Sequence, residues 1–178
     1  MQVLPTISTG IFVYQSFISE SKNWGTFVFA QSFMAYSVFS LLSLFTTGFL
    51  VDKFSSRKLI PFMNIPLIFA LIVLVFFDHP YIAFIFLGLC GISNGISNVL
   101  GASTWAELYG VKHIGSIKAL TTAIMVFSTA FGTAIFGFLI DKGLSIEGIA
   151  LACTTYIVLM TILLLLCRKS FEPTYLSE

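Results

Sequence analysis

The stretch LIPFMNIPLIFALIVLVFF, residues 59–77, contains no charged side chain. It is about as long as the 20 mainly apolar residues that a helix needs to cross a lipid bilayer. Pro61 and Pro66 predict a bend near its start, where neighbouring helices can satisfy the freed carbonyl groups. A helix of this kind decides the fold class, because in lipid every backbone polar group must be paired within the protein.

The rest of the chain has the same character. Apolar residues make up 57% of its 178 residues, charged residues 10%, and its mean hydropathy is +0.99. An average soluble domain has about 25% charged residues, so the composition excludes a water-soluble globule, and its high hydrophobicity excludes a disordered chain. A net charge of +1 gives no electrostatic footprint for nucleic acid. We therefore expect an all-α integral membrane protein.

Five further apolar runs accompany this stretch. The sequence predicts one bundle over residues 1–178 with six transmembrane helices, at about residues 3–19, 26–50, 59–77, 80–103, 119–140 and 146–167.

The basic residues between these helices predict the orientation. Six crossings place both termini on one side, together with the 51–58 and 104–118 loops. That side holds seven of the nine basic residues, and the other side holds only Lys22 and Lys142. Because basic loops stay in the cytoplasm, we expect cytoplasmic termini and a plasma-membrane location, the inner membrane in a bacterium. The seven are Lys53, Arg57, Lys58, Lys112, Lys118, Arg168 and Lys169.

Polar side chains recur at helical spacing inside three of the predicted helices. The amides among them are costly to remove from water unless every hydrogen-bonding end is paired. Two interpretations are open: the polar stripes line a water-filled cavity that contacts a solute, or they join neighbouring helices by hydrogen bonds. The candidates for the cavity are Tyr14, Gln15, Gln31, Tyr36, Asn94 and Asn98.

Small residues on the same helices predict close helix packing, as in the Gly91-x-x-x-Gly95 pair. The predicted packing positions are Gly88, Gly91, Gly95, Gly132 and Gly137.

Catalytic and metal-binding patterns do not occur in the predicted helices. His79 and His113 fall in loops, and no acidic or basic residue lies at depth, so the chain carries no evident proton relay. We expect no enzymatic activity, no cofactor and no metal.

The 48–60 stretch combines a glycine, an acid and a basic cluster. Asp52 follows the end of a predicted helix, where the helix dipole disfavours an anion, so we expect a basic side chain or a helix N-terminus to pair with it. Lys53, Arg57 and Lys58 can supply such a pair or hold anionic headgroups. The alternative is an ordinary positively charged cytoplasmic turn.

The pattern Gly48-x-Leu50-x-Asp52-Lys53, followed by Arg57-Lys58, resembles the loop motif of the major facilitator superfamily. In that family the motif joins the second and third helices of each six-helix half. The 105–117 stretch resembles the loop before the family's eleventh helix. The 137–143 stretch resembles the end of that helix. Tyr14-Gln15 with Trp24 resembles the end of the seventh helix in the monocarboxylate and oxalate/formate branch.

The resemblance implies half of a twelve-helix major facilitator fold, the C-terminal half, in a transporter that works by alternating access. Its partners would be a small-molecule solute, the lipid bilayer and a second six-helix half. Since Met1 leads directly into the first predicted helix, we expect a truncated product, with one half of a split transporter and a homodimer as alternatives. A membrane protein that does not transport, and instead scaffolds or regulates a partner through its helices, is the alternative from another class.

Overall fold

A computed structural model describes residues 3–110 and 114–166 of the chain, and within these ranges it contains helices and no strand. The last residue of the sixth predicted helix, Cys167, lies outside the described residues, and so does part of the predicted 104–118 loop, residues 111–113. Four residues discussed above are therefore not described: Lys112, His113, Arg168 and Lys169. The elements in chain order are α1 Val3–Val13, α2 Gln15–Ser21, α3 Thr26–Phe54, α4 Ser56–Leu59, the 3-10 helix η1 Ile60–Phe62, α5 Ile65–Phe76, α6 Ile82–Tyr109, α7 Ile114–Asp141 and α8 Ile146–Leu166.

Five of the predicted membrane crossings are present as helical segments that are long and apolar enough to span a bilayer. They are Phe27–Phe54, Ser56–Phe76, Ile82–Tyr109, Ile114–Asp141 and Ile146–Leu166. The segment from Ser56 is the bent one that the two prolines predicted, because it is divided into α4, η1 and α5.

The first predicted helix, residues 3–19, is not one continuous helix. Tyr14 has a φ of −99° and a ψ of 25°, so it leaves the helical region and separates α1 from α2. Neither piece alone is long enough to cross a bilayer. Backbone hydrogen bonds still continue through the break, from Tyr14 N to Gly10 O at 3.0 Å and from Ile18 N to Tyr14 O at 3.1 Å.

Three helix ends differ from the prediction by four residues or more. α3 ends at Phe54 rather than 50, α6 ends at Tyr109 rather than 103, and α7 begins at Ile114 rather than 119. The prediction stopped each helix at the first charged residues, but charge marks the edge of the apolar region and does not end a helix. The helices end where the backbone turns, at Ser55 with a φ of 68° and at Gly110 with a φ of 71°.

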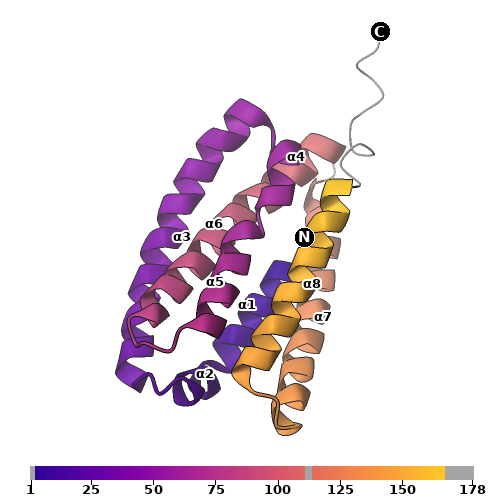
Figure 1. Cartoon of the computed structure of the whole chain (residues 1–178). Helices are drawn as coiled ribbons and strands as arrows, with labels where there is room; N and C mark the ends of the chain where they lie inside the picture. The colour runs from indigo at the N-terminus through magenta and orange to yellow at the C-terminus, as the bar shows by residue number, and fades with distance from the viewer. Residues whose placement is uncertain (1–2, 111–113, 167–178) are drawn as a thin grey trace.

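The helices form one bundle (Figure 1). A buried apolar core joins α1, α2, α3, α5, α6 and α8, and Leu67, Leu71 and Phe86 are among its most deeply buried side chains. The bundle has two opposite ends. The motif end is where α3 and α6 end and α7 begins, and the Lys22 end is where α2 and α5 end and α8 begins.

α3 and α6 lie closely side by side because glycines of α6 face the backbone of α3. A Cβ atom at Gly91 would collide with the carbonyl oxygen of Tyr36, and one at Gly95 with Ser43 Oγ and Ser40 O. At Gly88 a Cβ would lie 3.1 Å from the ring of Phe39.

α1 packs against α7 in the same way. A Cβ at Gly132 would collide with Thr6, and one at Gly137 would lie 2.5 Å from the hydroxyl oxygen of Tyr14. At Gly10 the glycine belongs to α1 and the contacting side chain to α7, because a Cβ there would lie 3.0 Å from the ring of Phe136.

Candidate functional site

A hollow of about 230 Å³ lies between α1, α6 and α7. We call it the α6–α7 groove. Its lining is Pro5 of α1, Asn94, Ser97, Asn98, Gly101, Ala102 and Trp105 of α6, and Lys118, Thr121, Thr122 and Met125 of α7. Both asparagines predicted to contact solute therefore line one space.

The groove extends from the motif end towards the middle of the bundle. At 1.5 Å per residue, Trp105 lies about 6 Å from the end of α6, Asn98 about 16 Å and Asn94 about 22 Å. Asn94 is also about 18 Å from the opposite end of α6, so the deepest amide lies near the middle of the helix. An aromatic ring and a lysine thus lie at the end of the groove nearest the motif end, which we call the mouth, and amide groups lie deeper.

Asn94 also joins two helices. Its Nδ2 donates a hydrogen bond to Ser40 Oγ of α3 at 3.4 Å. One amide therefore combines both interpretations of the polar stripes, because it borders the groove and bridges α6 to α3. Its neighbour Asn98 is exposed.

The other four predicted cavity residues do not line this groove. Tyr36 packs edge-on against Phe12, with ring centroids 5.2 Å apart. Tyr14 stacks on Phe136 and donates a hydrogen bond to the carbonyl oxygen of Thr133 at 3.3 Å. Gln15 is half-buried at the start of α2, and Gln31 is exposed on α3. Their contact with a solute stays a prediction.

Lys118 is a groove residue that the sequence analysis placed in a loop. The prediction began the helix at residue 119, whereas α7 begins at Ile114 and takes Lys118 into its second turn. The sequence did contain a signal for this earlier start, Gly110. A glycine ends α6 there, so the next helix can begin within a few residues.

At the motif end, Glu107 of α6 binds the segment that follows α3. Its carboxylate accepts hydrogen bonds from Ser55 Oγ at 2.7 Å and from the backbone N–H of Ser56 at 2.9 Å. Arg57 donates to the carbonyl oxygen of Glu107 at 2.8 Å, and its Nε lies 3.8 Å from the carboxylate. Glu107 thus satisfies the first N–H of α4, a role that the sequence analysis missed.

Asp52 does not take part in this network. It is exposed, and within residues 3–110 and 114–166 no side chain or helix N-terminus pairs with it. The expected pairing with Arg57 is not formed, because Arg57 binds Glu107 instead. Lys53 lies over the ring of Phe54, 5.4 Å from its centroid, and Lys58 is exposed. Gly48 has no neighbouring atom within 4 Å of the position of a Cβ.

A second charged cluster lies at the Lys22 end. The Nζ atom of Lys22 is 2.6 Å from Asp78 and 2.8 Å from Glu147, and the lysine side chain is only 1% exposed. Trp24 donates a hydrogen bond to the backbone oxygen of Asp78 at 2.7 Å. Burial alone would lower the pKa of Lys22, but the hydrogen bonds and charges of the two carboxylates outweigh it and raise this pKa above 10.5. The cluster ties together the ends of α2, α5 and α8.

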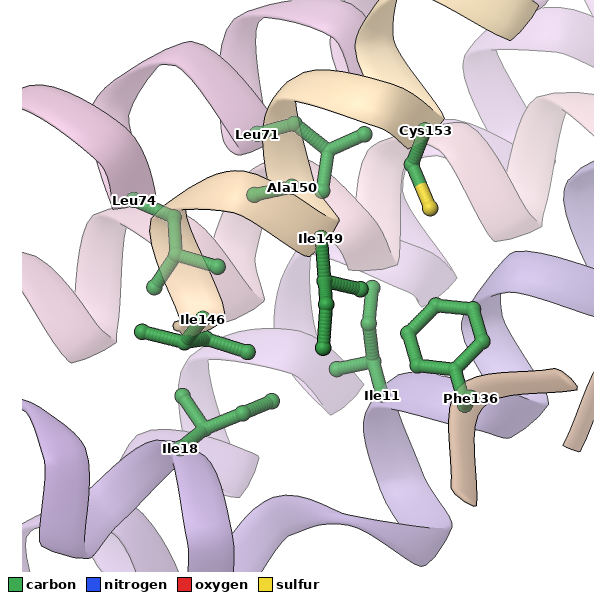
Figure 2. Close-up of a pocket in the computed structure, with 9 residues that line it drawn as sticks. All are labelled: Ile11, Ile18, Leu71, Leu74, Phe136, Ile146, Ile149, Ala150 and Cys153. Carbon is green, nitrogen blue, oxygen red and sulfur yellow. The ribbon is translucent and has the colours of Figure 1, made fainter. Parts of the chain in front are cut away.

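A smaller hollow is enclosed by apolar side chains of α1, α2, α5, α7 and α8 (Figure 2). Its volume is about 10 Å³ and nine apolar residues line it, among them Ile11, Phe136 and Ile149. A hollow of this size holds one water at most and offers that water no polar partner. It is a packing gap in the core and not a solute site.

Comparison with known proteins gives one match. The sequence model of the Major Facilitator Superfamily matches residues 4–176, nearly the whole chain. No curated protein and no solved structure matches the sequence.

Proposed function

The chain belongs to the major facilitator superfamily of membrane transporters, and we propose that it is the C-terminal six-helix half of a secondary transporter that moves a small solute by alternating access. We further propose that it belongs to the monocarboxylate and oxalate/formate branch, on the strength of Tyr14-Gln15 and Trp24.

The α6–α7 groove is the observation that carries this proposal. Secondary transporters bind their solute near the bilayer midplane, at the interface of two repeats that rock against each other. Asn94 lies near the middle of α6 and Asn98 one turn nearer the motif end, and both border a hollow of about 230 Å³. Two amides that border such a space can orient a polar solute there.

The sixth crossing of this half is made by α1 and α2 together. Residues 3–21 cover about 28 Å at 1.5 Å per residue, close to the roughly 30 Å of the hydrocarbon core. The backbone hydrogen bonds on both sides of Tyr14 support a single, bent crossing. With six crossings both termini lie on the same side, which we assign to the cytoplasm from the basic loops.

A second bundle is needed to enclose the groove. α7 forms one wall of the groove, and large apolar side chains such as Leu120, Phe127 and Phe131 on the same helix are exposed. We propose that a second six-helix half, from another chain or a second copy of this one, covers the groove. Asp52, exposed and without a partner in the described residues, would contact that half, with Lys53 and Lys58 beside it.

Solute counterflow in liposomes tests the proposal. The purified chain is reconstituted alone or, where a neighbouring gene encodes a second six-helix half, together with that half. The liposomes are loaded with unlabelled lactate, formate or oxalate. We expect exchange of at least one labelled anion, and a loss of about fivefold or more in Asn94→Leu, because a buried hydrogen bond to a solute is worth roughly 1–3 kcal/mol. Thr155→Val is the control, since Thr155 is exposed on α8 and bonds only to Leu151 O.

The alternative, a membrane scaffold that acts through helix contacts, is favoured by the bond from Asn94 to Ser40. It predicts no counterflow in any reconstitution. It also predicts that Asn94→Leu weakens the bundle without changing solute binding.

A further inference from the structure

Among the described residues that line the α6–α7 groove, one is charged, Lys118. The other lining residues are neutral, and no carboxylate is among them. The acid closest in sequence on α6, Glu107, is occupied by Ser55, Ser56 and Arg57. Lys118 makes no ion pair with any residue of the part of the chain that the structure describes. The groove therefore carries a net positive charge that no acidic side chain of residues 3–110 or 114–166 balances.

The position of the charge is as informative as its sign. Lys118 lies four residues into α7, and Trp105 lies four residues before the end of α6, so both are about 6 Å from the motif end. The ring of Trp105 is stacked on Tyr109, with centroids 5.9 Å apart, which holds it at the mouth. Asn98 and Asn94 lie about 10 and 16 Å deeper than Trp105. The charge and the amides are therefore two separate places in one groove.

We propose that the mouth of the groove is an anion-binding subsite, distinct from the deeper amide site, at which Lys118 holds a carboxylate or phosphate group beside Trp105. This inference goes beyond the proposed transport function and does not require it. A lysine ammonium is a point charge with three donors, suited to oxyanions of differing geometry. Charge of one sign in a cleft with low-dielectric walls also concentrates counter-ions there. The anionic group can come from a free solute or from a phospholipid headgroup at the membrane surface.

Quenching of tryptophan fluorescence by iodide tests this subsite. The chain has two tryptophans, and Trp24 is only 2% exposed, so most quenching by a dissolved anion reports on Trp105. The full chain is placed in nanodiscs of neutral phosphatidylcholine and titrated with iodide, and in parallel with acrylamide, which is uncharged. A Trp105→Phe variant identifies the signal that belongs to Trp24.

We expect Lys118→Gln to lower the iodide quenching constant by about threefold or more, because the charge in the cleft no longer concentrates the anion. Its acrylamide quenching constant should not change, which shows that the groove is still open and folded. Lys118→Arg should keep the iodide constant. Lys142→Gln is the matched control, since Lys142 is exposed near the other end of α7. Equal iodide quenching in the original chain and in Lys118→Gln would overturn the proposal.

Competition distinguishes the two sources of the anion. If a free anion binds, phosphate or acetate should reduce iodide quenching in the original chain more than in Lys118→Gln. If a headgroup binds, adding phosphatidylglycerol to the nanodisc should reduce iodide quenching in the original chain more than in Lys118→Gln. If neither competes, Lys118 only attracts anions diffusely and the subsite is refuted. None of these measurements involves transport, so a failure of counterflow leaves the result intact.

Discussion

Individual side chains determine how the two ends of the bundle are held. Lys22 at one end is bound by two segments of the chain, through Asp78 and Glu147, and Glu107 at the other end is bound by residues 55–57. Both lie outside the long apolar runs from which the fold was predicted. Their roles depend on which carboxylate or hydroxyl the fold brings within 3 Å, and sequence spacing does not contain that information.

Lys22→Met tests the cluster at the Lys22 end. The substitution leaves Asp78 and Glu147 without their common cation, and we expect it to cost about 1–3 kcal/mol. This is below the value for a fully buried pair, because the side chains of Asp78 and Glu147 are 77% and 39% exposed. The measurement is the free energy or midpoint of unfolding in detergent. Lys142→Met, at an exposed lysine, is the control and should change either quantity little. An equal effect of both variants would contradict a stabilising role for the cluster.

The same cluster predicts a pH dependence. Because folding raises the pKa of Lys22 above 10.5, its contribution to stability is complete at neutral pH and is lost as the pH rises through that higher value. Unfolding of the original chain should therefore become easier above about pH 10.5, and less so in Lys22→Met.

At the scale of elements, glycines decide which helices touch. Gly91 and Gly95 of α6 lie against the backbone of α3, whereas Gly101 of the same helix has no atom within 4 Å of a Cβ position. The Gly-x-x-x-Gly spacing predicted a packing face without identifying the partner helix.

Gly91→Ala and Gly101→Ala form a matched pair for this contact. In an open helix position, replacing glycine by alanine stabilises by up to about 1 kcal/mol. At Gly91 the new methyl group meets the carbonyl oxygen of Tyr36, which is backbone and cannot rotate away. We expect Gly91→Ala to destabilise the bundle by about 1–3 kcal/mol and Gly101→Ala to leave it as stable or more so. The midpoint of thermal unfolding should thus fall in Gly91→Ala and stay the same or rise in Gly101→Ala, and an equal fall in both variants would refute the packing role.

The connection between α3 and α5 gives a second prediction at this scale. Glu107→Ala removes the acceptor for Ser56 N and Ser55 Oγ, a loss comparable to that of a helix cap at about 1 kcal/mol. Hydrogen exchange measured by mass spectrometry should become faster in residues 55–59 and stay unchanged in α8. Glu20→Ala, at an exposed acid of the Lys22 end, is the control. Unchanged exchange at 55–59 would show that Glu107 does not hold α4.

For the whole molecule, the number of crossings determines where the termini lie. Five crossings would place the two ends on opposite sides of the membrane, and six would place them on the same side. We expect reporter fusions at Met1 and after Glu178 to give the same compartment, the cytoplasm, if α1 and α2 together make the sixth crossing that we propose. Different compartments for the two reporters would show that the divided segment does not cross.

The amino-acid sequence by itself determined the fold class, five of the membrane crossings and their approximate positions. Each of these follows from apolar runs without charge, because lipid cannot satisfy a polar backbone and only a helix can cross it unaided. The bend in the third segment was also predictable, since proline removes a backbone donor wherever it stands.

Only the tertiary structure decided which residues share a space. The break at Tyr14 coincides with contacts to Thr133 and Phe136, more than a hundred residues away. Lys118 joined the groove because α7 begins a turn earlier than its charge pattern indicated. Helical periodicity records which residues share a face of one helix, and it carries no record of the neighbouring helix that this face meets. That neighbour is set by close packing of the whole bundle, which makes a groove from Asn94, Asn98 and Lys118 and leaves Gln31 outside it.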